Sequence, residues 1–250
     1  MTEPTTVPHA PGPPRVLLIG GSVAHGLGVR LSWGARAAEA LAATEVLDLT
    51  SSGPLIDEDV ARLDEVTAFR PHVALVDVGI AEQIVHAAPA VQQLIERFAP
   101  AGWHGVAGLA PRPYFSTSSR RRALRQRAVS RAKTVVKRAA LRLGGSTRMP
   151  LPEVREHMTH LLEHLDGLGA TTLVVGTFPV DESLFPGTPA AFSALEEMLL
   201  EVVAGVVSAR LVVPDVRVWD DYLADHMHWN DAGHDRVADQ VVAKLARSVA

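Results

Sequence analysis

The segment RVLLIGGSVAHG, residues Arg15–Gly26, joins an apolar run to two glycines and a serine. A short, nearly continuous apolar run that ends in glycine is typical of a parallel strand covered on both faces. The serine hydroxyl that follows can belong to a turn, to a phosphate-binding loop or to a nucleophile. A turn is the simplest of these, because strand-to-helix connections favour Gly and Ser. Other parts of the chain are needed to choose among the three.

Similar apolar runs recur along the chain and alternate with longer patterns of helical spacing. The expected strands are Arg15–Gly20, Glu45–Leu49, Val73–Val78, Thr171–Gly176 and Arg210–Val213. The expected helices are Trp33–Ala43, Asp57–Phe69, Pro89–Phe98, Pro152–Leu168, Pro189–Ser208 and Ala232–Ser248. Alternation of this kind predicts right-handed crossovers. It therefore predicts an α/β protein with a three-layer α/β/α sandwich around a five-stranded parallel sheet.

The composition is ordinary for a globular protein, with 250 residues of which 47% are hydrophobic and 21% charged. The formal charge of −4 argues against a generic nucleic-acid binder, and the absence of cysteine excludes disulfides, thiolate metal sites and cysteine nucleophiles. Residues 1–14 hold five prolines and are expected to form a disordered tail ahead of one domain over 15–250. No apolar run approaches the ~18 residues needed to span a bilayer, so we expect a cytoplasmic protein.

A basic segment, residues about 100–149, interrupts the alternation between the third and fourth strands. No acidic residue lies between Ala99 and Pro152, and the segment holds twelve basic residues: Arg112, Arg120, Arg121, Arg122, Arg125, Arg127, Arg131, Lys133, Lys137, Arg138, Arg142 and Arg148. Because the whole chain carries −4, the remainder carries about −16. An apolar stripe at three- and four-residue steps predicts a basic amphipathic helical insertion. The stripe consists of Leu124, Ala128, Ala132, Val135, Val136, Ala139 and Leu143.

The basic helix has several possible roles. Its arginines can pair with the acidic remainder of the chain, as on an ordinary solvated helix. It can also be a lid over an active site, a docking face for an acidic acyl carrier or a phosphorylated substrate, or a contact with a membrane surface. The sequence does not separate these roles.

The phosphate-binding interpretation of the glycine–serine loop fails on spacing. Gly21 and Gly26 lie about as far apart as the glycines of a Walker loop, but Leu27 stands where that loop needs a lysine. The three-glycine dinucleotide pattern also fails, because Ser22 takes the place of its second glycine. Nucleotide binding at this loop is therefore not expected.

The nucleophile interpretation requires a general base and a group that orients it. The stretch DHMHWNDAGH, residues Asp225–His234, supplies both near the end of the chain. An aspartate three residues before a histidine can accept the Nδ1 proton, which leaves Nε2 free for a serine hydroxyl. Ser22 follows the first strand, and Asp225 and His228 precede the last helix. In an open parallel sheet these positions lie at the carboxyl edge, where ligands bind.

Four stretches together resemble the ordered blocks of the SGNH (GDSL-type) hydrolases: LLIGGSVAHG, SSGP around Gly53, VDVGIAEQ after the third strand, and DHMHWNDAGH. The resemblance spans about residues 15 to 248, and the last block is its most specific part. It implies a flavodoxin-like sheet and a serine that hydrolyses or transfers acyl groups. It also implies that Ser22 is the nucleophile, His228 the base and Asp225 its orienting carboxylate. The amides of Ser22 and Gly53 would donate to the oxyanion.

The chain departs from the family pattern at two places. Gly21 stands where the family usually has aspartate, and Ala81 stands where an asparagine of a Gly-x-Asn-Asp block supplies a third oxyanion donor. Losing one such donor costs on the order of 3 kcal/mol in other serine enzymes, or about a hundredfold in rate. We expect the substrate to lie beside this block, whose residues are Gly79, Ala81, Glu82 and Gln83, with Gln83 or another group replacing the missing donor.

The sequence therefore predicts a serine hydrolase that cleaves a carboxylic ester of a small molecule or a lipid through an acyl-enzyme on Ser22. An alternative is an acyltransferase that moves an acyl group from a carrier or coenzyme A to a hydroxyl acceptor. In that case the basic insertion would receive the acidic carrier. A third possibility is a binding protein with weak catalysis. None of these needs a metal or a cofactor, and no nucleic-acid partner is expected.

Overall fold

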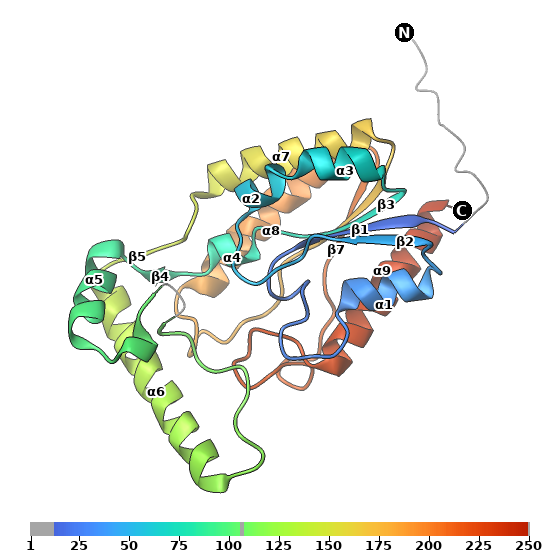
Figure 1. Cartoon of the computed structure of the whole chain (residues 1–250). Coiled ribbons are helices and arrows are strands. Elements are labelled where there is room, and N and C mark those ends of the chain that lie inside the picture. Colours follow the sequence, from blue (N-terminus) through green and yellow to red (C-terminus); the bar gives the residue numbers. More distant parts are fainter. Residues whose placement is uncertain (1–12, 106–107, 250) are drawn as a thin grey trace.

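A five-stranded parallel sheet forms the centre of the molecule (Figure 1). The computed structural model describes residues 13–105 and 108–249, so the tail expected at 1–14 lies almost entirely outside the described residues. The sheet consists of β1 (Arg15–Gly20), β2 (Glu45–Asp48), β3 (Val73–Asp77), β6 (Thr171–Val175) and β7 (Ala209–Val212). Their order is β2-β1-β3-β6-β7, which is the flavodoxin-like arrangement. The predicted sheet is confirmed.

Helices cover both faces of this sheet and complete a three-layer sandwich (Figure 1). On one face α1 (Trp33–Ala40) packs against α9 (Asp231–Val249). The other face carries α2 (Ile56–Val60), α3 (Leu63–Phe69), α7 (Leu151–Gly167) and α8 (Thr188–Ala204). The central strands are enclosed between the two layers, as residues 16–19 and 73–76 are all buried. This burial on both faces explains the continuous apolar runs.

The helix expected over Asp57–Phe69 is two short helices in the structure. α2 ends before Ala61, and α3 begins after Arg62, whose backbone (φ −101°, ψ 12°) leaves the helical region. The first turn of α3 carries Asp64 and Glu65. Acidic side chains stabilise a helix N-terminus, so they favour a second start at this point.

Most of the segment between β3 and α7 forms a separate arm of the structure (Figure 1). It contains α4 (Ile80–Gln83), α5 (Pro89–Phe98), the 3₁₀ turn η1 (Ala101–Trp103) and α6 (Arg120–Arg142). A short antiparallel pair, β4 (His86–Ala87) with β5 (Gly145–Ser146), joins the two ends of the arm. Ser119 caps α6 by accepting a hydrogen bond from the Arg122 amide at 3.4 Å.

The basic helix α6 differs from its simplest interpretation in how its charges are used. Across the described ranges, none of its arginines or lysines forms an ion pair with a carboxylate. The expected pairing with the acidic remainder of the chain is therefore not what this structure contains. No helix of the described part is both long enough and apolar enough to cross a membrane.

Candidate active site

Ser22 lies in a tight turn directly after β1. Gly20 adopts φ +151°, and a side chain there would place its Cβ 2.3 Å from the Asp77 carbonyl oxygen, so only glycine fits. The Gly21 amide donates to the same carbonyl at 3.2 Å. The carbonyls of Gly21 and Ser22 then accept from the amides of His25 and Leu27, at 2.9 and 3.1 Å. These bonds hold the Ser22 backbone at the carboxyl edge of the sheet.

The loop before α9 brings a histidine and an aspartate to this serine. Ser22 Oγ lies 2.9 Å from His228 Nε2, and His228 Nδ1 lies 2.7 Å from Asp225 Oδ2. The other Asp225 oxygen accepts the amides of Met227 and His228, at 3.1 and 3.2 Å. Because a carboxylate accepts hydrogen bonds, the contact with Asp225 fits the neutral tautomer with its proton on Nδ1. That tautomer leaves Nε2 as an acceptor for the Ser22 hydroxyl. The structure thus brings together the three residues that the sequence predicts.

Burial within this group is graded. Asp225 is 2% exposed, whereas Ser22 is only half-buried. A buried carboxylate with a fixed histidine and an accessible hydroxyl is the arrangement that a serine nucleophile needs.

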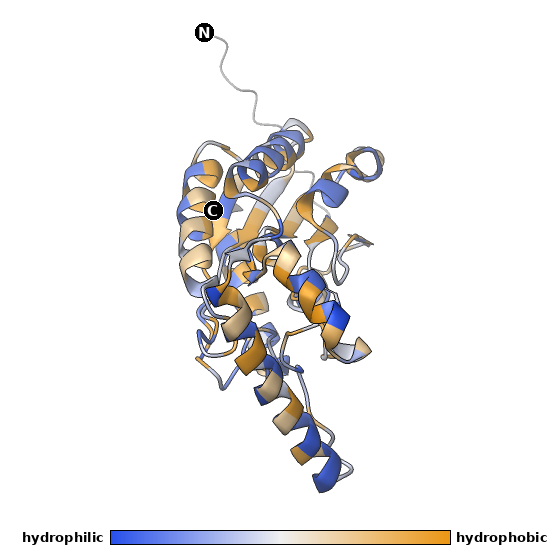
Figure 2. Cartoon of the chain, turned by 90° about the vertical axis from the view of Figure 1, so that its left-hand side faces the viewer, coloured by the Kyte–Doolittle hydropathy of each residue, from blue (hydrophilic) through white to orange (hydrophobic). Residues whose placement is uncertain are grey.

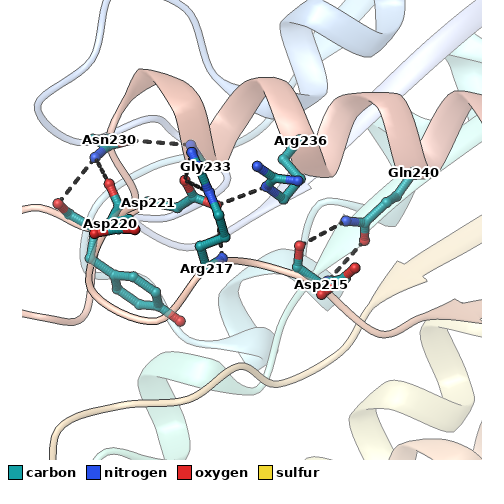
Figure 3. A network of polar contacts seen from close by, with 9 residues as sticks. Asp215, Arg217, Asp220, Asp221, Asn230, Gly233, Arg236 and Gln240 are labelled. Carbon is teal, nitrogen blue, oxygen red and sulfur yellow. Dashed lines mark hydrogen bonds and ion pairs between the residues drawn. The ribbon is translucent and has the colours of Figure 1, made fainter.

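A polar network fixes the loop that carries Asp225 and His228 (Figure 3). The carboxylate of Asp221, with no exposed surface, accepts bonds from the Arg217 amide and side chain and from Arg236 Nε at 2.8 Å. Burial alone would raise the pKa of Asp221, but the bonds from Arg217 and Arg236 outweigh it and hold that pKa below its usual value. An ionised Asp221 therefore ties the loop to α9.

Asn230 completes the same network at the start of α9 (Figure 3). Its Nδ2 donates to the carbonyls of Asp220 and Tyr222, at 2.7 and 3.2 Å, and its Oδ1 accepts the Gly233 amide at 3.2 Å. An asparagine that accepts from a first-turn amide is an N-cap. Asn230 therefore caps α9, and the cap fixes the chain two residues after His228.

Two further side chains, His226 and Asp181, support the loop from the other side. His226 Nδ1 lies 2.9 Å from Asp181 Oδ2, and its ring stacks on Trp219 with centroids 4.4 Å apart. Burial would raise the pKa of Asp181, but bonds from Ser183 and His226 hold it below its usual value. The pairing joins the loop after β6 to the loop before α9. The two residues are 45 positions apart, so no local sequence pattern predicts their contact.

The Gly53 loop is held by an arginine from the basic segment. Gly53 adopts φ +115°, and its carbonyl accepts hydrogen bonds from both terminal nitrogens of Arg148, each at 3.1 Å. The Arg148 amide donates to the Glu82 carbonyl at 2.8 Å. The sequence does not indicate this role of Arg148, because its partner lies 95 residues away and is the backbone carbonyl of Gly53, which has no side-chain signature.

The block expected to lie beside the substrate is more enclosed than that expectation implies. Glu82 and Gln83 are 2% and 3% exposed. Glu82 Oε1 accepts the Ile56 amide at 2.6 Å, and Gln83 Nε2 donates to the Met149 carbonyl at 2.9 Å. Both side chains therefore connect backbone segments around the site. Gln83 is committed to Met149, which leaves it poorly placed to replace the missing oxyanion donor.

Gly79 and Ala81 complete that block. Gly79 adopts φ +89°, where a Cβ would lie 3.1 Å from Leu195 Cδ1, so its backbone needs glycine. Ala81 is half-buried and carries no polar side-chain atom. The two amides expected to face an oxyanion are free of competing hydrogen bonds. In residues 13–105 and 108–249, no hydrogen bond is donated by the amide of Ser22 or Gly53.

Three buried carboxylates line a small cavity beside Gly21 and Ala81. They belong to Asp59, Asp77 and Glu82. Burial first, and then the charge of Glu82, raise the pKa of Asp77 and of Asp59 to about 7 each. Burial also raises the pKa of Glu82. The position where the family pattern has aspartate, Gly21, thus borders a place already occupied by acidic groups.

Among the described residues, no metal site is found, and the buried histidine His234 has a structural role. No group of three or more His, Asp or Glu residues in the described part is arranged to hold a metal ion. His234 is buried, and its Nδ1 accepts the Trp33 amide at 3.1 Å. Burial, aided by the charge of Arg36, lowers the pKa of His234 to about 3. It is therefore a neutral structural residue.

The sandwich has the fold of the GDSL-type (SGNH) esterases and acylhydrolases, as the resemblance in the sequence implies. The structure of TesA superposes with a TM-score of 0.57 at 16% identity, over 94% of this chain and 99% of that one. The psychrotrophic esterase EstA from Pseudoalteromonas, inhibited by monoethylphosphonate, gives a TM-score of 0.54 at 11% identity, over 94% and 98%.

A GDSL-like lipase from Bacteroides thetaiotaomicron gives a TM-score of 0.54 at 10% identity, over 94% of this chain and 88% of the other. No protein-family model matches the chain, and no curated protein sequence does. At these identities the likeness establishes the fold, and the chemistry has to be argued from the site.

Proposed function

We propose that the protein hydrolyses a carboxylic ester through an acyl-enzyme on Ser22. The observation that carries this proposal is the chain of contacts from Ser22 Oγ to His228 Nε2 at 2.9 Å and from His228 Nδ1 to Asp225 Oδ2 at 2.7 Å. The fold it shares with esterases and lipases adds support. The presence of a phosphonate inhibitor in one of those structures suggests the probe to use here.

In the proposed reaction, Ser22 Oγ attacks the ester carbonyl carbon while His228 Nε2 accepts the hydroxyl proton. The C–O bond to the alcohol breaks as the tetrahedral intermediate collapses, and His228 returns the proton to the leaving alkoxide. A water molecule then attacks the acyl-enzyme with His228 again as base, and the acid and free Ser22 result. Asp225 keeps the imidazole in the required tautomer and stabilises the imidazolium that forms.

The oxyanion in this reaction would be stabilised by the unbonded amides of Ser22 and Gly53. Because Ala81 offers no side-chain donor, we expect the chemical step to be slower than in a site with three donors, by about a hundredfold. Arg148 compensates in part, since its two bonds to the Gly53 carbonyl fix the direction of that peptide. Preorganised donors stabilise developing charge without reorganisation during the reaction.

An acyltransferase is the second candidate, and one observation favours it. A cleft of about 830 Å³ lies between α6 and the loop after β6, and its lining includes Arg138 and Arg142. Asp181, which bonds His226, also lines this cleft, so it adjoins the loop that carries His228. Glu182 lines the cleft as well, so two carboxylates face the two arginines. The arginine side of the cleft could receive the anionic part of an acyl donor such as coenzyme A or an acidic carrier.

A fluorophosphonate probe tests the proposal, because it reacts covalently with an activated serine. Wild-type protein should be labelled, Ser22→Ala should not, and the matched control Ser193→Ala on the exposed side of α8 should be labelled normally. Equal labelling of wild type and Ser22→Ala would reject the assignment. Turnover of an activated ester with and without an added alcohol then separates hydrolysis from transfer, since only a transferase yields a new ester in preference to the acid.

A further inference from the structure

Helix α6 has its polarity reversed relative to an ordinary surface helix. Its outer face, defined here as Leu124, Ala128, Ala132, Val135 and Ala139, is exposed along its whole length, with Leu124 64% and Val135 65% exposed. Its inner face contains Ser130, Lys133, Thr134, Lys137 and Ala140, all of them buried. Apolar side chains normally face the protein and charged ones the solvent. In α6 the apolar stripe predicted from the sequence faces outwards instead.

The contacts of the inner face show that this orientation is fixed. Lys133 Nζ donates to the Gly102 carbonyl at 3.1 Å. Lys137 lies over the ring of Phe185, 4.7 Å from its centroid, and is 2% exposed. Arg138 donates to the Ser183 carbonyl at 2.8 Å. Rotating the helix so that the stripe faced the protein would break these contacts. They therefore keep the outer face exposed to solvent.

Arginines surround this open apolar stripe. Eight of them on α6 are exposed: Arg120, Arg121, Arg122, Arg125, Arg127, Arg131, Arg138 and Arg142. Within the described residues none is paired with a carboxylate. On a helical projection at 100° per residue, Arg131 and Arg138 flank one side of the stripe and Arg125 the other. Figure 2 shows hydrophobic and strongly hydrophilic positions interleaved along this helix as it extends away from the sandwich.

The charge pattern limits what can cover the stripe. A second copy of the chain is disfavoured, because residues 99–152 hold no acidic side chain and two such helices would repel each other. The occupant must offer an apolar layer for the stripe and negative charge on both sides of it. At 23 residues the helix is about 35 Å long, so the occupant must also present these features over that length.

We propose that the outer face of α6 is a docking surface for an anionic lipid bilayer. A helix that stands out from the body can lie flat on a membrane without the sandwich obstructing it (Figure 1). The stripe would then sit at the headgroup–acyl boundary, and the flanking arginines would reach lipid phosphates. An acidic protein could match the charge, but it would need a groove of the same length to enclose the stripe. A flat anionic bilayer offers an apolar layer and negative charge along the whole length of the helix, and it needs no groove of matching shape.

This surface is joined to the candidate active site at both ends of the basic segment. The Ala224 amide, next to Asp225, donates to the Pro113 carbonyl at 2.8 Å. At the other end Arg148 binds the Gly53 carbonyl. Docking through α6 would therefore hold the serine site at a constant position relative to the lipid surface. The docking itself does not depend on the serine chemistry.

Vesicle sedimentation tests the proposal with the full-length Ser22→Ala protein, so that the result does not depend on the proposed hydrolysis. We expect binding to vesicles of phosphatidylcholine with about one third phosphatidylglycerol, and little binding to phosphatidylcholine alone. Binding should weaken at least tenfold between low salt and about 0.5 M salt, because screening reduces the arginine contribution.

Two double variants separate the parts of the surface. Arg125→Gln/Arg131→Gln should weaken binding about 25-fold, at about fivefold for each cation removed, whereas Arg30→Gln/Arg247→Gln elsewhere on the surface should not. Leu124→Gln/Val135→Gln should weaken binding at least tenfold. Its control, Leu200→Gln/Val207→Gln, changes two exposed apolar residues outside the basic segment. Far-UV circular dichroism checks that each variant is folded.

Several outcomes would overturn the proposal. Absence of binding to the anionic vesicles would do so directly. So would equal binding of Leu124→Gln/Val135→Gln and the parent protein, because the stripe would then have no part in docking. If poly-L-glutamate displaced the protein completely from the vesicles and the stripe variant bound normally, α6 would be a site for acidic proteins instead.

Discussion

Asp77 gives the most quantitative prediction of the structure. Its side chain is 2% exposed at the end of β3, and within the described ranges neither carboxylate oxygen has a hydrogen-bond partner. Burial, together with the charge of Glu82, raises its pKa from 3.8 to about 7. Replacing it by the neutral isostere in Asp77→Asn removes this titration and keeps the shape of the side chain.

The sign follows from the two protonation states. The pKa is higher in the folded state than in the unfolded state, so between pH 4 and 7 the unfolded chain binds fewer protons, and stability falls as the pH rises. The difference between 3.8 and about 7 corresponds to about 4 kcal/mol at 1.36 kcal/mol per pKa unit. About 3 kcal/mol of this accrues between pH 5 and pH 8. The unfolding free energy of Asp77→Asn minus that of wild type should therefore rise by about 3 kcal/mol over that interval.

Urea unfolding followed by circular dichroism measures this difference at each pH. The exposed residue Asp239 on α9 supplies the control, because Asp239→Asn lies outside the cluster of Asp59, Asp77 and Glu82 and should differ from wild type by a nearly constant amount. Taking the difference between variant and wild type cancels the titration of His234 and of other groups that do not interact with Asp77, while the interaction with Glu82 is part of the measured difference. If the Asp77→Asn difference were the same at pH 5 and pH 8, the carboxyl would ionise normally and the reasoning would be refuted.

Three further predictions concern individual residues. Lys137→Met should raise the unfolding free energy by about 3 kcal/mol at pH 7, because burial lowers the lysine pKa to about 8. The unfolded lysine keeps its proton up to about pH 10.5, so the gain in unfolding free energy should vanish above that pH. Urea titrations at pH 7 and pH 11 measure this difference. Arg148→Ala should lower kcat about tenfold with KM nearly unchanged, since the Gly53 amide would lose its fixed direction. Arg148→Lys should recover little of this activity, because lysine lacks the two-nitrogen fork of arginine. A change in KM alone would indicate that Arg148 contacts the substrate instead. Gly21→Asn should be tolerated, because a Cβ there meets nothing within 4 Å. Gly21→Asp should melt several degrees below wild type at pH 8 but not at pH 5, where the neighbouring carboxyls are neutral. An equal difference in melting temperature at both pH values would show that repulsion by these carboxyls is not the cause.

Much of the fold could be predicted because its determinants are local. The central strands β1, β3 and β6 are buried on both faces and read as short apolar runs, whereas the edge strands β2 and β7 are partly exposed. All five appear in the sequence within about two residues of their observed ends. Ser22, Asp225 and His228 were also predictable. Strand ends of a parallel sheet share one edge, and the Asp-x-x-His spacing lies within a single loop.

The remaining features depend on contacts that periodicity does not encode. The stripe on α6 identified a helix, but a repeat of three and four residues does not say which side of the helix is covered, and the covered side carries Lys133 and Lys137. The bond from Arg148 to Gly53 and the pairing of Asp181 with His226 join distant segments. Asp77 was unexpected for another reason: unpaired acidic residues are rarely fully buried, so its place in the strand gave no hint of an altered pKa.

The central claim is that Ser22 forms an acyl-enzyme. Its most direct test is mass spectrometry of the protein after acid quenching during turnover of an activated ester. The account predicts a mass increase equal to the acyl group, located on the peptide that contains Ser22, and no increase and no turnover above background for Ser22→Ala. An acyl group on another residue, or wild-type turnover by Ser22→Ala, would contradict it.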